Sequence, residues 1–177
     1  LNTTAENSTL TVDADNGVLT NDTDPDTTDT LTVSEVAGDG SNIGSGVAGS
    51  DGGTFTIASD GSYTFDPGAA FDSLAQGEST TTSVAYTVSD GHGGTSSNAL
   101  TVTVTGTNDA PVITDGPDTA NINETDTELI ASGTLAVSDV DTTDVVTASR
   151  TLAVTGSSDR SDAAAPSDAE LLNMSTL

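Results

Sequence analysis

The sequence contains no cysteine, no tryptophan and only five aromatic residues, three phenylalanines and two tyrosines, in 177 positions. Without cysteine the chain cannot be a small disulfide scaffold, although this absence suits a secreted protein that avoids stray disulfides. No apolar run is long enough to cross a bilayer. No charged-then-apolar signal segment opens the chain, so we expect an internal piece of a longer protein.

Basic residues are almost as scarce, since two arginines face 28 acidic residues and the formal net charge is −26. Such a field repels phosphate, which excludes nucleic acid as a partner and argues against direct membrane contact. The same charge opposes compaction. We therefore expect the fold to depend on bound cations or on high salt.

The residues that are present alternate between apolar and polar along short segments, which argues against the disorder that low hydrophobicity and high charge would otherwise favour. Residues 83–106 are typical of a hairpin with a longer loop, and residues 53–65 of a tighter hairpin that turns at Asp60-Gly61. Further strands are expected at 8–12, 17–20 and 30–36. About seven short strands within residues 1–107 predict an all-β, immunoglobulin-like sandwich. A helix is expected only at 167–174.

An internal repeat is the second organising feature. The segment TDPDTTDTLTVS (23–34) aligns with SDVDTTDVVTAS (138–149), with seven of twelve positions identical. Two tandem modules are therefore predicted: residues 1–107, a linker at 108–111 stiffened by a proline, and residues 112–177 as the N-terminal part of a second module. That second module is partial, because it would have to run past residue 177 to match the first.

The repeated segment is rich in aspartate, and Asp24, Asp26 and Asp29 recur 115 residues later as Asp139, Asp141 and Asp144. Alternating carboxylates in an extended loop can point their oxygens at one centre, and hard carboxylate oxygens suit Ca²⁺. The alternative is a solvated turn, since Asn, Asp and Pro favour turns for local reasons. Recurrence of the same three aspartates favours the calcium interpretation.

GVLTNDTDPDTTDTLTV, DGSYTF, YTVSDGHGGT and VTGTNDAPV, in this order and spacing, resemble the VCBS and cadherin-like repeats of large bacterial surface adhesins. Many of those are of the RTX type and leave the cell by type I secretion. The resemblance covers essentially the whole chain. It implies tandem immunoglobulin/cadherin-like Greek-key β-sandwich modules, secreted or displayed on a bacterial surface and stiffened by calcium. The glycine-rich calcium nonapeptide of RTX tails is absent from the sequence.

The predicted calcium ligands follow from this arrangement. The aspartates of the second module should approach Asn108-Asp109, and in cadherin-like linkers acidic residues of the preceding module complete such a site. Glu6 and Glu78 are the candidates, with ordinary surface glutamates as the alternative. The candidate metal ligands are thus Asn108, Asp109, Asp139, Asp141, Asp144, Glu78 and Glu6, together with Asp22, Asp24, Asp26, Asp29 and Asp90 for a half-site facing a module before residue 1.

The predicted function is a calcium-rigidified extender of a secreted bacterial adhesin, acting in cell adhesion or biofilm. It would hold a ligand-binding tip away from the cell, with neighbouring repeats of the same chain as its partners and a monomeric state. The alternative is a split domain that hosts or forms a sugar- or peptide-binding site. We expect no enzyme activity, because His92, the only histidine, has no nucleophile or orienting partner in the sequence pattern.

Overall fold

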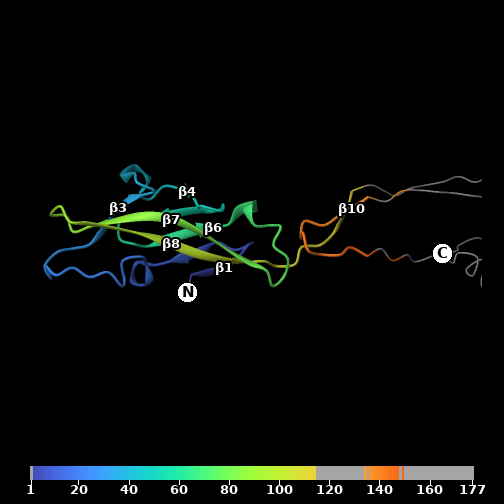
Figure 1. Ribbon diagram of the computed structural model, residues 1–177, viewed down its shortest axis with the longest axis horizontal. Helices are drawn as coiled ribbons and strands as arrows, with labels where there is room; N and C mark the ends of the chain where they lie inside the picture. The colour runs from blue at the N-terminus through green and yellow to red at the C-terminus, as the bar shows by residue number, and fades with distance from the viewer. Residues whose placement is uncertain (1, 115–133, 135, 148, 150–177) are drawn as a thin grey trace, which may run out of the picture. The chain divides into compact units, whose positions relative to one another are not determined.

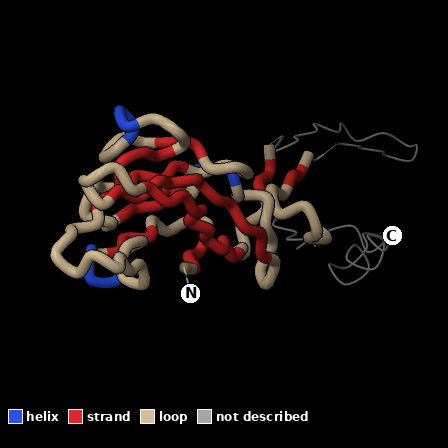
Figure 2. The backbone as a smooth tube through the Cα atoms, turned by 60° about the vertical axis from the view of Figure 1, so that its left-hand side comes forward, coloured by secondary structure: helices blue, strands red, loops and turns tan. Residues whose placement is uncertain are grey.

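The described strands of the computed structural model form two four-stranded sheets and one two-stranded ladder (Figures 1 and 2). The structure describes residues 2–114, 134, 136–147 and 149. Residues 1–146 form one compact unit and residues 147–177 a second one. The helix expected at 167–174 lies outside the described residues. Among the helices of the described part, none is long and apolar enough to cross a membrane.

The strands are short except for one hairpin. In chain order they are β1 Thr3–Ala5, β2 Leu10–Val12, β3 Thr32–Val36, β4 Val47–Ala48, β5 Thr54–Ile57, β6 Tyr63–Asp66, β7 Ser79–Ser89, β8 Thr95–Thr105, β9 Val112–Ile113 and β10 Val137–Ser138. Three short 3₁₀ helices accompany them: η1 Ala14–Asn16, η2 Gly40–Asn42 and η3 Gly68–Ala70.

The first sheet has the order β1-β8-β7-β3 and the second the order β2-β6-β5-β4. The chain changes sheet after β1, β2, β3 and β6, so consecutive strands repeatedly lie in different sheets. β1 is the exception to antiparallel pairing, because it runs parallel to β8 with Thr3 opposite Thr103 and Ala5 opposite Thr105. The all-β sandwich predicted from the alternation is confirmed.

Both predicted hairpins are present. The β7–β8 ladder is continuous from Ser79 opposite Thr105 to Ser89 opposite Thr95, so its strands are longer and its turn shorter than the sequence suggested. The tighter hairpin joins β5 to β6. Its turn is held by Asp60, whose Oδ1 accepts a hydrogen bond of 3.0 Å from the Ser62 N–H. The expectation for this turn is therefore also met.

The strand expected at 17–20 is wrong, because local capping outweighs the apolar alternation there. The Asp13 side chain accepts a hydrogen bond of 3.1 Å from the Asn16 N–H and caps η1, which turns the chain just before this segment. Val18 then donates to the Gly61 carbonyl at 2.9 Å instead of joining a ladder. Four short strands, β1, β4, β9 and β10, were not predicted, since two or three residues carry too little alternation to be recognised.

The apolar residues of the alternating segments fill the space between the two sheets. Phe65 lies at the centre, with ring centroids 4.6 Å from Phe55 and 6.4 Å from Phe71. The other members of the core are Val18, Val33, Val36, Ile57, Tyr63, Val84, Tyr86, Val88, Leu100, Val102 and Val104. This core fixes the strands whose connections form the two ends of the sandwich, with residues 22–29 at one end and the linker at the other (Figure 1).

The repeat beyond the linker contributes β9 and β10, which pair antiparallel with Val137 opposite Ile113 and Ser138 opposite Val112. The module boundary at 108–111 stays a prediction.

Candidate metal centres

Glu6 directly follows β1 at the end of the sandwich that leads into the linker. Its N–H donates to the Thr105 carbonyl at 3.0 Å, which extends the β1–β8 pairing and turns the side chain toward the linker. Oε1 accepts hydrogen bonds from the Thr107 N–H at 2.7 Å and the Thr107 hydroxyl at 2.8 Å. The residue is only 1 % exposed, and its Oε2 is buried without a hydrogen-bond partner. Glu6 is therefore not an ordinary surface glutamate.

Gly106 allows the chain to leave β8 close against the loop before β7. A Cβ on this residue would lie 2.3 Å from the carbonyl oxygens of Leu74 and Ala75, so a larger residue would push the linker away. The Gly106 N–H donates to the Glu78 carbonyl at 3.0 Å. Glu78 is half-buried, and its Oε2 accepts from the Ala75 N–H at 3.1 Å, which holds this loop at the linker.

Asp141 meets the linker from the second copy of the repeated segment. Its Oδ2 accepts a hydrogen bond of 2.9 Å from the Asp109 N–H, and its own N–H donates to Asp139 Oδ1 at 3.1 Å. Asp141 is 2 % exposed, and its Oδ1 is buried without a partner. Asn108 is exposed and donates its side-chain amide to the Asp109 carbonyl at 2.6 Å.

Four neighbouring carboxylates act on Asp109. The pKa of Asp109 is raised above its ordinary value of 3.8, first by desolvation and then by the negative charges of Asp141, Glu6, Asp72 and Asp139. We call these five carboxylates the junction cluster: Glu6, Asp72, Asp109, Asp139 and Asp141. Carboxylate oxygens that are buried, unpaired and mutually repelling are costly unless a cation offsets them.

Asp72 was not among the residues predicted from the sequence. It lies in the same loop before β7 as Glu78, and this loop abuts the linker through Gly106. The sequence signal for Asp72 is that it lies six residues before Glu78, in the same loop before β7. Two acidic residues of one loop can reach the same site. Asp144, in contrast, is exposed and closes its loop by donating its N–H to the Asp141 carbonyl at 3.1 Å.

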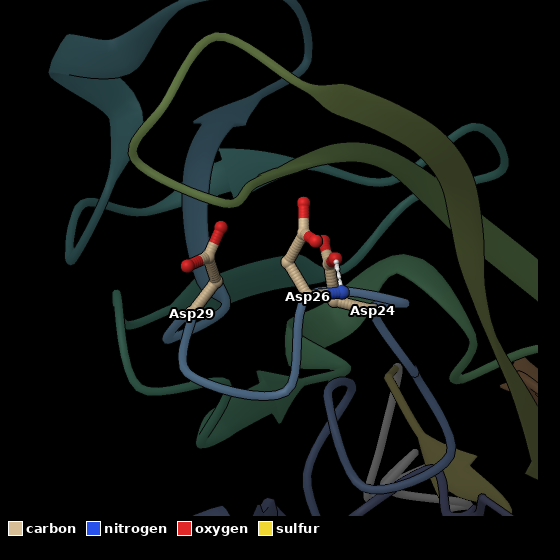
Figure 3. Close-up of side chains that lie close together, drawn as sticks. All are labelled: Asp24, Asp26 and Asp29. Atoms are coloured by element: carbon tan, nitrogen blue, oxygen red, sulfur yellow. Dashed lines mark hydrogen bonds between the residues drawn. The ribbon is translucent and has the colours of Figure 1, made fainter.

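The second group of carboxylates lies in residues 22–29, which we call the aspartate loop. Each of Asp24, Asp26 and Asp29 offers a carboxylate oxygen, and these atoms lie within 4.8 Å of one another (Figure 3). Two oxygens that bind one Ca²⁺ at its usual distances can be at most about 5.2 Å apart. The spacing therefore fits a shared divalent cation.

The two copies of the repeated segment have the same local hydrogen bonds. In the aspartate loop, Asp26 N–H donates to Asp24 Oδ1 at 2.8 Å, as Asp141 N–H does to Asp139 Oδ1 in the second copy. Asp29 N–H likewise donates to the Asp26 carbonyl at 2.9 Å, as Asp144 N–H does to Asp141. The copies differ in burial, since Asp26 is exposed and Asp141 is buried. That difference is what contact with a preceding linker produces.

The turn after β7 lies at the same end as the aspartate loop, as predicted. His92 Nδ1 lies 3.0 Å from Asp29 Oδ2. Both oxygens of Asp90 accept backbone hydrogen bonds, from His92 N–H at 2.7 Å and from Gly94 N–H at 2.9 and 3.1 Å. These bonds, led by the one from His92, hold the pKa of Asp90 below its ordinary value. Asp22 has a buried Oδ2 without a partner. Whether Asp22 or Asp90 binds metal stays a prediction.

Comparison with known proteins agrees with this architecture. A family model described as a bacterial cadherin-like domain matches residues 1–106. The match covers the whole first sandwich, including Glu6, the aspartate loop and the loop that holds Asp72 and Glu78. A comparison with curated proteins finds no match.

Proposed function

The chain belongs to the bacterial cadherin-like domain family, and on that premise we propose that it is a calcium-stiffened extender of a bacterial surface adhesin. Cadherin-like domains of this kind are typical of extracellular, adhesin-like repeats, and they generally bind calcium. The extender would hold a ligand-binding tip away from the cell, in adhesion or biofilm. Type I secretion and an RTX-type parent protein belong to the same proposal.

The observation that carries this proposal is the pair of unpaired oxygens at the linker. Glu6 Oε2 and Asp141 Oδ1 are both buried without a hydrogen-bond partner, and they come from opposite sides of the linker in sequence. A buried carboxylate oxygen without a donor is costly unless a cation or a proton occupies it. Ca²⁺ suits this donor set, because the cluster offers carboxylate oxygens and no nitrogen or sulfur ligand.

The mechanism is electrostatic. Without a cation, the carboxylates of the junction cluster repel one another and oppose a close approach of the second repeat to the linker. When calcium is bound, its positive charge would offset this repulsion at the two unpaired oxygens, Glu6 Oε2 and Asp141 Oδ1. Calcium would bind preferentially when the second repeat lies against the linker. It therefore stabilises that arrangement by mass action.

The partners in this proposal are calcium and neighbouring repeats of the same chain, and the chain acts as a monomer without enzyme activity. The acidic surface supports this assignment, since a net charge of −26 keeps copies apart and repels nucleic acid and anionic membranes.

Calcium titration against EDTA tests the proposal. Calcium is expected to raise the melting temperature and to lengthen the particle in small-angle scattering. If neither changes between EDTA and calcium, the proposal is wrong. A double variant, Asp139→Ala with Asp141→Ala, should lose the lengthening while the first sandwich stays folded. Unfolding of residues 1–106 in this variant would place the site elsewhere.

A further inference from the structure

The longest identical stretch of the internal repeat is Asp-Thr-Thr-Asp, at 26–29 in the first copy and at 141–144 in the second. Its aspartates belong to the candidate metal ligands, but metal binding does not explain the threonines between them. Thr142, the first threonine of the second copy, directly follows the buried Asp141. Its contacts show what a threonine at this place can do.

Thr142 contacts the loop before β7 in the first sandwich. Its N–H and its hydroxyl both donate to the Ser73 carbonyl, at 3.4 and 3.3 Å. Ser73 lies 69 positions earlier in the chain, so the contact joins the second copy of the repeated segment to the first sandwich. The donors and the acceptor carry no charge. The contact can therefore form without a cation, and salt does not screen it.

The Ser73 carbonyl is held in place by its own loop. Asp72 and Ser73 are the central residues of a tight turn. The Leu74 N–H closes this turn by donating to the Phe71 carbonyl at 2.9 Å. Phe71 is buried in the hydrophobic core, and Leu74 packs against that core. The folded sandwich thus presents the acceptor, and little order has to be gained when Thr142 binds it.

On each side of this contact, a carboxylate precedes the hydrogen-bonding residue. Asp72 precedes Ser73, and Asp141 precedes Thr142. The contact therefore brings two acidic residues to the linker together, and the charges of both raise the pKa of Asp109. Like charges oppose this approach. Hydrogen bonds between neutral groups are what can hold the two loops together when no cation is bound.

Asp141 is held from two sides as a result. Its Oδ2 accepts from the Asp109 N–H at 2.9 Å, and its neighbour Thr142 is bonded to the Ser73 carbonyl. The buried Oδ1 of Asp141 has no partner, so its direction depends on how the loop is held. In the first copy, Thr27 takes the place of Thr142. It is exposed, and within the described residues its N–H and hydroxyl have no hydrogen-bond partner.

We propose that Thr142 is a positioning residue of the junction: it docks the second copy of the repeated segment on the Ser73 carbonyl and thereby sets the register in which the junction cluster meets calcium. The hydrogen bonds form with or without a cation, and calcium then binds carboxylates that are already aligned. The inference deepens the proposed function and rests on it, because alignment matters for calcium only if the junction cluster binds calcium.

Thr142→Val in the full chain tests the proposal, with Thr27→Val as its matched control and Thr142→Ser as its rescue. Valine keeps the β-branched shape without the hydroxyl, whereas serine keeps the hydroxyl. The first readout is hydrogen exchange of the Asp109 amide in EDTA, because this N–H binds Asp141 Oδ2. Exchange should be about threefold faster in Thr142→Val than in Thr27→Val, the low end for one hydrogen bond because this bond is long and exposed. Thr142→Ser should exchange as the parent chain does.

The second readout is calcium affinity, followed by NMR through the amide shift of Thr107. This N–H binds Glu6 Oε1, so it reports on the junction cluster and not on the aspartate loop. Thr142→Val should bind calcium about threefold more weakly than Thr27→Val, by the same loss of alignment. Amides of the β7–β8 ladder should exchange alike in all variants, since Thr142 is exposed and lies outside the first sandwich.

Equal Asp109 exchange in Thr142→Val and Thr27→Val overturns the proposal, whatever calcium does. A Thr142→Ser chain that exchanges as fast as Thr142→Val overturns it as well. Equal calcium affinities of the two valine variants, when the parent chain binds calcium, overturn the positioning role. If the parent chain does not bind calcium while Asp109 exchange still differs between the variants, the proposed function fails and the docking contact stands.

Discussion

The backbone N–H of Asp109 donates a hydrogen bond of 2.9 Å to Oδ2 of Asp141, so a linker residue orients a carboxylate that lies 32 positions further along the chain. The bond leaves Asp141 Oδ1 buried and without a partner. One carboxylate oxygen, Oδ2, is thus held by the backbone, and the other, Oδ1, is available to a ligand. A site that is oriented in this way loses less conformational freedom when a cation binds.

The Glu6 carboxylate should stabilise the folded chain when calcium is present and should not stabilise it when calcium is removed. Replacing it by glutamine keeps an oxygen for Thr107 but removes a buried charge whose Oε2 has no partner. In EDTA, Glu6→Gln should therefore melt at the same or a higher temperature than the parent chain. In calcium it should melt lower, because calcium affinity falls by about tenfold or more, or about 1.4 kcal/mol. Calorimetric melting in both buffers measures this.

Glu35→Gln is the matched control for this variant, since Glu35 is exposed on β3 and outside the junction cluster. It should follow the parent chain in both buffers to within about 0.5 kcal/mol. A Glu6→Gln chain that gains as much from calcium as the Glu35→Gln chain would remove Glu6 from the site.

Asp26 and Asp141 occupy the same place in the two copies of the repeat. Their replacement should nevertheless differ in its effect on the calcium-dependent lengthening of the particle. Asp141→Asn should abolish the calcium-dependent lengthening in small-angle scattering, because Asp141 contacts the linker. Asp26→Asn should leave the lengthening intact and cost no more than about 0.5 kcal/mol in EDTA, since Asp26 is exposed. Equal loss of lengthening in both variants would contradict a distinct junction site.

The pH dependence of stability should reverse sign when calcium is added. Because the pKa of Asp109 is raised above 3.8, the folded chain binds a proton more tightly than the unfolded chain in the window just above that value. In EDTA, this residue's contribution to stability therefore falls as pH rises through the window. In calcium, protonation removes a ligand, so the calcium-dependent stabilisation falls as pH drops through the same window.

Asp109→Asn isolates this effect, since it should flatten both slopes. Asp39, Asp60 and Asp90 do not interfere, because turn hydrogen bonds lower their pKa values below 3.8 and their contributions are lost only at lower pH. Chemical denaturation at a series of pH values gives the slopes. Equal slopes in the parent and variant chains would show that Asp109 is not the group that titrates.

Gly106→Ala should destabilise the first sandwich and loosen the linker. Its Cβ would lie 2.3 Å from two carbonyl oxygens, so backbone must shift, at a cost of roughly 1–3 kcal/mol. Gly46→Ala is the control, because the nearest atom there is a Thr54 methyl at 3.0 Å, which can move. Urea unfolding compares the two variants, and equal midpoints would mean that the linker path is not constrained at Gly106.

Sequence alternation predicted the long strands and failed for the short ones, for a physical reason. β7 and β8 have eleven residues each, enough for a clear apolar row, whereas β1 has three and is held by parallel pairing with β8. Pairing between residues a hundred positions apart leaves no local pattern. At 17–20 the pattern misled, because the cap at Asp13 and the bond from Val18 to Gly61 decide the backbone there.

The candidate sites were recognised from repetition more than from composition. The shared offset of 115 residues predicted that Asp24 and Asp139 play equivalent parts, and both accept the same local hydrogen bond. The sequence did not predict that Glu6 and Asp141 would be buried, because burial depends on how the linker passes over the end of β8. Asp72 was missed for the same reason.

The parallel pairing of β1 with β8 has a consequence for a chain under tension. A pull applied before β1 and after β8 draws the two strands in opposite directions along their ladder, in shear. The bonds from Thr103 N–H to the Asn2 carbonyl at 2.8 Å and from Glu6 N–H to the Thr105 carbonyl at 3.0 Å then share the load and must break together. Glu6 ends this ladder, so a cation held by its carboxylate would brace the strand that bears the force.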